Sequence, residues 1–414
     1  MRQLEGPLSP TERIYTLDVV RGFALLGILI MNMPGFANSF FVEADGSHLW
    51  SAPVDRAAEV VRDMLFSGKF NSMFSLLFGI GFTIQFARMQ ELSPGHATQL
   101  YLRRLLVLLA LGVVHAIVFW TGDVLHVYAA LGLLLLLVLR HATDRMIIGM
   151  IILLLLYPAF SGVARLLVMT PEITARLVAE AQAFEVSNNL AYGQGSFVDA
   201  AREHVREFAY NYDNVWALWA NLGFYVQMAT TMLIGVLIGR HHLERRIAEL
   251  MPWVRRLQWW LLGIGIICAL TFGIIFQVDR VPGPSPLKIL GSITYVLSRI
   301  SLMLFYVLTI VRLAQLPTWQ KRFAPMAAAG KMPLTNYLMQ TMICTTLFYG
   351  WGFGWWGKVG PAMQLALAFG IFFMVQVPLS MLWLKRFRWG PLEYAWRVAT
   401  YGKLPSKQIA APVG

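Results

Sequence analysis

The chain has 414 residues, of which 57% are hydrophobic and only 14% are charged. About a quarter of the residues of a soluble protein are charged, and here the apolar residues are gathered into long runs, so the composition excludes an ordinary soluble domain. The net charge of +12 does not indicate nucleic-acid binding, because the basic residues are scattered through short connections between the apolar runs.

The apolar runs predict an all-α integral membrane protein. A helix needs about 20 residues to cross the hydrocarbon core of a membrane, and about ten runs meet this requirement. We treat residues 1–414 as a single polytopic domain. The predicted spans are residues 17–35, 69–88, 102–120, 123–140, 146–168, 216–239, 257–277, 288–311, 332–350 and 362–384.

The basic residues predict the orientation of these spans. With the N-terminus inside, 23 of the 34 Lys and Arg residues fall on the inner side and 10 on the outer side. Short cytoplasmic connections are enriched in Lys and Arg, so both termini are expected in the cytoplasm. Multi-pass insertion in the bacterial cytoplasmic (inner) membrane is the expected location.

The chain divides by its predicted connections into four parts. Residues 13–140 form an N-terminal four-helix part, 141–215 the fifth span with an extracytoplasmic segment, 216–400 a C-terminal five-helix part, and 401–414 a cytoplasmic tail. The outer segments 36–68 and 169–215 contain amphipathic helical stretches, and in 198–212 the residues Ala201, Val205, Phe208 and Tyr212 share one face. Such helices would lie on the outer membrane surface or cover a cavity.

The first span begins with Asp18 and Arg21, which share one helix face at i and i+3. A local ion pair with a snorkelling arginine is the alternative to a ligand-binding role. Three polar residues are expected towards the outer side: Asn32 near the end of the first span, His48 in the following connection, and Lys69 at the start of the second span. For Lys69 the alternative is snorkelling.

His115 and Asp123 flank a tight turn between the third and fourth spans. So short a connection makes the two helices antiparallel neighbours, which brings His115 and Asp123 to a similar depth. An imidazole held by a carboxylate is a candidate general base. Two alternatives remain: Asp123 as the N-terminal cap of its helix, and His115 as a hydrogen-bonding group between helices.

Arg299 stands in the middle of the predicted span 288–311. A guanidinium inside the membrane is costly unless it is paired or hydrated, which predicts an anion-binding group in an internal cavity. The alternative is a structural ion pair, with Asp18 as a candidate partner. Cys268 and Cys344 both fall inside apolar runs and predict neither a disulfide nor a metal site.

Five strings resemble, in order, the YeiB-type family of bacterial membrane proteins, whose C-terminal half is a domain of unknown function. They are RIYTLDVVRGFALLGILIMNM (13–33), FSGKFNSMFSLLFGIGF (66–82), LLVLLALGVVHAIVFWTGDVLHVYAALGLL (105–134), GKMPLTNYLMQT (330–341) and GPLEYAWR (390–397). That family is more remotely similar to the transmembrane acyltransferases, which include heparan-glucosaminide acetyltransferase. The L-D-x-x-R-G string at Leu17–Gly22 is shared with those enzymes.

This resemblance implies that acyl-CoA, as acetyl-CoA, is the co-substrate and binds from the cytoplasmic side, with no metal. The implied donor-binding residues are Asp18, Arg21, Arg299, Lys331 and Asn336, and the implied catalytic pair is His115 with Asp123. Asn32, Lys69 and His48 would lie on the acceptor side. Two positions depart from the related enzymes, which have a histidine just before their second span and often a histidine where this chain has Gln340.

The predicted function is therefore acyl transfer from cytoplasmic acyl-CoA to an extracytoplasmic hydroxyl or amine. A transporter or permeation pathway for an anionic small molecule and a non-catalytic membrane scaffold are the alternatives. The expected partners are membrane lipid, an extracytoplasmic glycan or small-molecule acceptor, and a second copy of the chain in a homodimer, but no nucleic acid.

Overall fold

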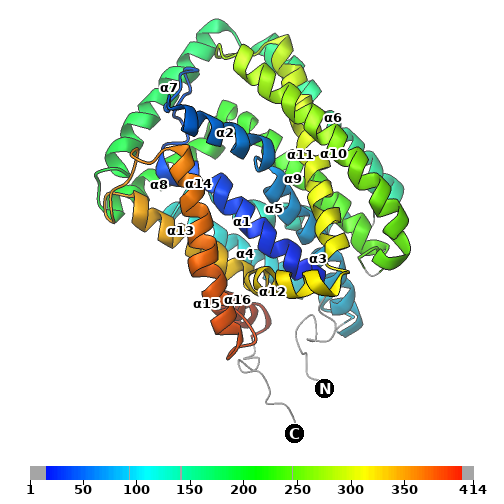
Figure 1. Ribbon diagram of the computed structural model, residues 1–414. Coiled ribbons are helices and arrows are strands. Elements are labelled where there is room, and N and C mark those ends of the chain that lie inside the picture. Colours follow the sequence, from blue (N-terminus) through cyan, green and yellow to red (C-terminus); the bar gives the residue numbers. More distant parts are fainter. Residues whose placement is uncertain (1–14, 93, 140–141, 245, 403–414) are drawn as a thin grey trace.

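The computed structural model describes residues 15–402 except for residues 93, 140–141 and 245. All regular structure in this part of the chain is helical, as predicted (Figure 1). The cytoplasmic tail expected at 401–414 lies outside the described residues from residue 403 onward, as do Arg2, Arg13, Arg140, Arg245, Lys403 and Lys407.

Eight helical segments among the described residues are long and apolar enough to cross a membrane, which confirms an all-α integral membrane protein. They are α1 (Tyr15–Ala37), α3 (Lys69–Leu92), α4 (Ala97–Val118), α6 (Asp144–Val168), α9 (Val215–Arg240), α10 (Ile247–Val278), α11 (Pro286–Leu313) and the continuous run Pro361–Leu384, which comprises α14 (Pro361–Gly370), η2 (Ile371–Gln376) and α15 (Val377–Leu384).

The other two predicted spans are shorter than expected. Residues 123–140 form α5 (Leu125–Leu139) with 15 residues, and residues 332–350 form α13 (Pro333–Phe348) with 16. Neither reaches the length of about 20 residues that spans the hydrocarbon core. Most of α13 is buried or half-buried among its neighbours, whereas α5 exposes Leu134, Leu137 and Val138.

Five further helices are present in the described residues. They are α2 (Pro53–Leu65), α7 (Pro171–Ala191), α8 (Phe197–Asp213), α12 (Pro317–Gly330) and α16 (Pro391–Tyr401). The first of them, α2, continues into α3 within the apolar segment Pro53–Glu91. The start of α1 and helix α16 lie at one end of the bundle, and α2 and α7 lie towards the other (Figure 1). We call these the inner and outer ends, following the predicted orientation.

Helix α1 is the centre of the bundle. In its most apolar 18-residue window 72% of the residues are buried, against 6% in α6, so α6 exposes most of its surface to lipid. α1 packs against α12, α13 and α14, and α3 packs against α9. Helices from the N-terminal and C-terminal parts therefore share one core.

Two glycines bring the backbones of α1 and α12 into contact. A Cβ at Gly22 would clash with the carbonyl oxygen of Met326, and a Cβ at Gly330 would clash with that of Asp18. Small residues allow such close crossings in membranes, where dispersion contacts between helices replace the hydrophobic effect. This explains the glycine of the L-D-x-x-R-G string and the first residue of GKMPLTNYLMQT.

Candidate functional site

The first candidate site is built at the turn between α4 and α5. The turn is fixed by Trp120, which is 1% exposed, stacks on Phe36 and donates from its indole nitrogen to the carbonyl oxygen of Gly35 at 3.1 Å. Asp123 then caps α5, because the backbone nitrogen of His126 donates to its Oδ2 at 3.0 Å. His115, one turn before the end of α4, faces this carboxylate.

His115 and Asp123 are in direct contact, as the sequence predicts. Nδ1 of His115 lies 2.8 Å from Oδ1 of Asp123, and the two residues are 2% and 4% exposed. On the other side of the ring, Nε2 lies 3.0 Å from Oγ1 of Thr341. The capping alternative also holds, since one carboxylate oxygen serves the cap and the other serves the imidazole.

Asp123 joins a second histidine to the same network. Nδ1 of His126 is 2.7 Å from Oδ2 of Asp123, and its Nε2 is 2.6 Å from the hydroxyl of Tyr212 on α8. Burial alone would raise the pKa of Asp123, but hydrogen bonds with His115 and His126 hold that pKa below its usual value. The carboxylate is therefore charged, and each imidazole donates Nδ1–H to it.

Helix α13 supplies the opposite wall of this site. Tyr337 and Thr341 stand at i and i+4 and so share one face. The Tyr337 hydroxyl donates to Oδ1 of Asp123 at 3.5 Å and accepts from the backbone nitrogen of Val124 at 3.3 Å. With Nδ1–H directed at Asp123, Nε2 of His115 accepts a hydrogen bond from the Thr341 hydroxyl, which is the arrangement of a hydroxyl, an imidazole and a carboxylate in nucleophilic enzymes.

A second buried polar cluster lies under α8. Its members are Glu207, His204, Asn188, Tyr192 and Thr121, and each has a buried side-chain atom without a hydrogen-bond partner of normal geometry. Burial raises the pKa of Glu207 to about 7, although Asn188, Tyr192 and Thr121 lie close enough to favour its charged form. Burial lowers the pKa of His204 to about 3, so this imidazole is neutral at physiological pH.

Helix α8 is amphipathic, as predicted, and its buried residues are mostly polar. Ala200, Glu203, His204 and Glu207 are buried, whereas Val205 and Tyr212 of the apolar stripe are exposed. Helix α8 packs on α4 and α9, and Phe208 and Tyr212 of the stripe contact the His126 ring. A helix that lies between protein and lipid can direct polar side chains towards the protein, because lipid is the less polar of its two surroundings.

Arg299 lies in a different place, on the wall of a cavity of about 460 Å³ between α1, α3, α6, α9 and α11. We call this the Arg299 cavity. Arg299 is 5% exposed, and its guanidinium lies over the Tyr295 ring at 4.7 Å. The predicted alternative, an ion pair with Asp18, is not found, because Asp18 pairs with Arg21 at 2.8 Å.

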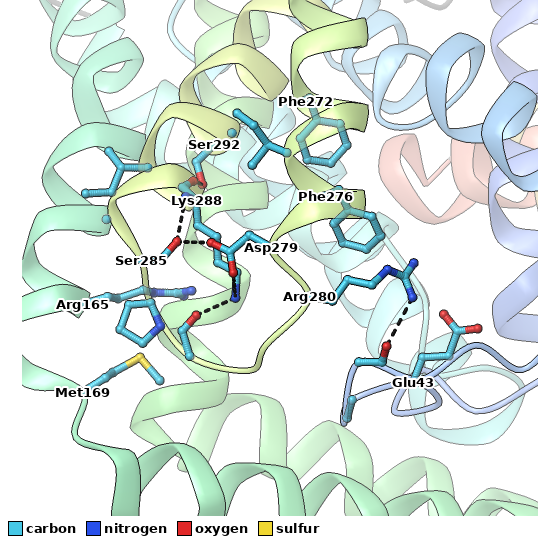
Figure 2. Close-up of a pocket in the computed structure, with 18 of the residues that line it drawn as sticks. Glu43, Arg165, Met169, Phe272, Phe276, Asp279, Arg280, Ser285, Lys288 and Ser292 are labelled. Atoms are coloured by element: carbon cyan, nitrogen blue, oxygen red, sulfur yellow. Dashed lines mark hydrogen bonds and ion pairs between the residues drawn. The ribbon is translucent and has the colours of Figure 1, made fainter.

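A second cavity of about 410 Å³ adjoins the Arg299 cavity at the outer end, and the two share Gly162, Arg165, Phe272 and Ser292. We call it the outer cavity. Figure 2 shows Arg165 and Lys288 on one side of it and Arg280 with Glu43 on the other. Lys288 lies 3.6 Å from Asp279, and Arg280 donates to the carbonyl oxygen of Gly46 at 3.2 Å.

The structure divides the predicted site residues into three groups. Asp18, Arg21 and Lys331 lie on α1 and at the end of α12, towards the inner end of the bundle. His115 and Asp123 meet at the α4–α5 turn. Asn32 lines the Arg299 cavity, Lys69 is buried close to Arg299, and His48 lies beside Arg280 at the outer cavity.

Two predicted donor-binding residues have surroundings that the sequence did not indicate. Asn336 is fully buried and its amide donates to the carbonyl oxygen of Ala329 and to Ser380, both at 3.0 Å, so it joins α12, α13 and α15. Arg299 is absent from the inner group and borders the cavity formed by the outer halves of α6, α9 and α11.

Sequence reasoning missed several residues of these sites. In the sequence His126 was only a further imidazole on the outer side, although an aspartate three residues before it on a helix start can reach its ring. Thr341 and Tyr337 carried a weaker signal, namely polar side chains at i and i+4 within an apolar run. Arg165 and Glu207 gave no signal, since each contacts helices distant in sequence.

Comparison with known proteins shows that the chain is similar to uncharacterised proteins. Residues 238–403 match the family described as a protein of unknown function (DUF418). The chain is 29% identical over 411 residues to the uncharacterized protein YxaH of Bacillus subtilis (strain 168), which covers 95% of this chain and 96% of the relative. It is 29% identical over 422 residues to the uncharacterized protein YeiB of Escherichia coli (strain K12), with 94% and 96% covered.

A third relative is an uncharacterized 39.9 kDa protein in the amylase 3' region of Bacillus acidopullulyticus, 27% identical over 404 residues, with 96% of both chains covered. No solved structure matches the chain. The family match and these nearly full-length similarities agree with the five sequence motifs. The chain is therefore similar over nearly its whole length to the uncharacterised proteins YxaH and YeiB, and its residues 238–403 match the DUF418 family.

Proposed function

We propose that the protein is a membrane-embedded acyltransferase that moves an acyl group from cytoplasmic acyl-CoA to a hydroxyl or amine on the outer side. The observation that carries this proposal is the buried row of Thr341, His115 and Asp123, with contacts of 3.0 and 2.8 Å. A histidine oriented by a charged carboxylate is the usual device for activating a hydroxyl.

In the proposed reaction His115 is the general base. Nε2 takes the proton from the acceptor hydroxyl as its oxygen attacks the thioester carbonyl; the new C–O bond forms, the C–S bond breaks, and His115 returns the proton to the CoA sulfur. Asp123 keeps Nδ1 protonated and stabilises the imidazolium that forms in between. A positioned base of this kind contributes about 10²–10⁴-fold in rate.

Thr341 occupies the position in which the acceptor hydroxyl would sit, because its own hydroxyl already donates to Nε2. In the proposal it holds the ring in place before the acceptor arrives and then gives way. Arg21 and Lys331, on the inner side, are the proposed partners of the phosphates of CoA, for which cations are the natural ligands. We place the protein in the bacterial cytoplasmic membrane, since its relatives are bacterial and outer-membrane spans are β-barrels.

The test is acyl transfer by purified protein from labelled acetyl-CoA to acceptors extracted from the cell envelope. We expect His115→Ala to lower the rate by about 10²–10⁴-fold and Asp123→Asn to lower it by a similar factor, because the amide favours the wrong tautomer. His96→Ala is the matched control, because His96 precedes the same helix at its other end and forms no capping bond. Full activity of a folded His115→Ala variant would remove His115 from the mechanism.

A further inference from the structure

The unusual feature of the Arg299 cavity is positive charge without a matching carboxylate. Arg299 is 5% exposed, its Nε has no hydrogen-bond partner, and its guanidinium lies over the Tyr295 ring at 4.7 Å. Arg165, on the same wall, lies over the Trp219 ring at 5.6 Å. Neither arginine forms an ion pair with a carboxylate of the described residues.

A lysine lies close to this charge. Lys69 is 1% exposed, lies near both Arg299 and Asp63, and donates to the backbone carbonyl oxygen of Asp63 at 3.0 Å. Two guanidiniums on the wall of one cavity inside a bilayer repel one another and lose hydration, which is costly unless an anion lies between them. A bound anion would offset this repulsion and the lost hydration, so the cavity is suited to an anionic ligand.

The other wall groups indicate the kind of anion. Asn32, Asn71, Ser67 and Ser161 add amide N–H and hydroxyl donors to the wall that holds the two guanidiniums. Guanidiniums bind the several oxygens of a phosphate through paired hydrogen bonds. One carboxylate would leave the second arginine without a partner, so a phosphate is the better match.

The shape and position of the cavity indicate how the ligand enters. The wall is formed by residues 157–165 of α6, 219–224 of α9 and 292–299 of α11, which are the outer halves of these helices. The adjoining outer cavity adds Arg280 and Lys288 along the route (Figure 2). Trp219, Phe224 and Tyr295 supply aromatic surface beside the arginines, where the apolar part of an amphiphile would fit.

We propose that the Arg299 cavity binds a phosphate group that enters from the outer side, either as the headgroup of an amphiphile or as free phosphate. The site is separate from the inner end, where the CoA phosphates are proposed to bind, and Arg299 therefore has a different ligand from Arg21. The proposal does not depend on acyl transfer, because binding is measured with no acyl donor present.

The test measures binding of two probes, inorganic phosphate and short-chain phosphatidic acid, to the purified full-length protein by thermal shift and native mass spectrometry. We expect Arg299→Gln and Arg165→Gln each to weaken binding at least tenfold. Arg202→Gln is the control, because the Arg202 side chain is 77% exposed and lies on α8. Tighter binding of phosphatidic acid identifies an amphiphile as the ligand, and equal binding identifies free phosphate.

A second measurement uses the unaltered protein, so it does not depend on a variant that folds. Phenylglyoxal modifies accessible arginines, and peptide mass spectrometry reads each position. We expect either probe to protect Arg299 and Arg165 at least fivefold while modification of Arg202 stays constant. No binding of either probe, or binding that Arg299→Gln leaves unchanged, would overturn the proposal.

Discussion

At the scale of single residues, the buried polar groups are of two kinds, those with hydrogen-bond partners and those that retain unpaired atoms. His115 and Asp123 form a satisfied network in which each polar atom has a partner, while Arg299 and Glu207 retain buried atoms without one. Satisfied networks rigidify a site, and unsatisfied groups mark places where a ligand, water or proton can bind. The sequence predicted His115, Asp123 and Arg299 because such residues are rare inside apolar runs.

Thr341 gives a prediction at this scale. If its hydroxyl only holds the His115 ring, Thr341→Ser keeps the hydrogen bond and should retain activity within about threefold, while Thr341→Ala should lower it about tenfold because the ring loses one anchor. Activity is compared as kcat and KM from pH 5 to pH 9. A loss as large as that of His115→Ala would instead assign Thr341 the role of acyl acceptor.

Glu207 gives a prediction for stability. Its pKa is about 7 in the fold and near 4.5 when unfolded, so the folded state holds the proton more tightly. Its contribution to stability is complete below pH 4.5 and is lost as pH rises through 7. The charged carboxylate should therefore cost on the order of 2–3 kcal/mol at pH 8.

The neutral variant Glu207→Gln isolates this effect, since the low pKa of His204 affects both proteins alike. Thermal unfolding should give similar Tm values for the two proteins at pH 5, where Glu207 is mostly protonated. At pH 8 the Gln variant should be the more stable protein. Equal pH profiles for wild type and variant would show that Glu207 is solvated or paired in the folded protein.

At the scale of elements, the long helices could be predicted from their apolar length, but their orientation about their own axes could not. The apolar stripe of α8 predicted a helix on the outer membrane surface or over a cavity, but it did not indicate that Glu203, His204 and Glu207 are buried. Periodicity distinguishes the two faces of a helix without identifying the surroundings of each. Helix α13 was likewise predicted as a full span, although it has 16 residues and its Asn336 and Gln340 side chains donate to neighbouring helices.

The crossing of α1 and α12 gives a prediction at this scale. Gly22→Leu should place a side chain against the backbone at Met326 and separate the two helices, which lowers the folding yield or destabilises the protein by about 1–3 kcal/mol or more. Gly149→Leu in α6 is the matched control, because a Cβ there meets nothing within 4 Å. Monodispersity after detergent extraction and Tm are the measurements, and equal behaviour of both variants would contradict a backbone contact.

At the scale of the whole molecule, the described chain is one bundle around α1 that has polar sites at several depths. The distribution of Lys and Arg predicts which end faces the cytoplasm, and the structure places the start of α1 and α16 at one end, as an N-in and C-in topology requires (Figure 1). The position of Arg165 and Arg299 on one cavity could not be predicted, because only the packing of α6 on α9 and α11 brings the two residues to that cavity. No internal repeat was found in the sequence that could have indicated which helices pack against each other.

The orientation itself is open to a direct test with cysteine labelling. In a protein with Cys268 and Cys344 replaced by Ser, single cysteines at Arg202 on α8 and Lys321 on α12 should lie on opposite sides of the membrane. A membrane-impermeant maleimide applied to intact cells should label the residue 202 variant at least tenfold more than the residue 321 variant, and lysis should equalise them. The reverse pattern would invert the bundle. The cavity of Arg299 would then open to the cytoplasm, and acyl-CoA rather than an outer phosphate would be the ligand within its reach.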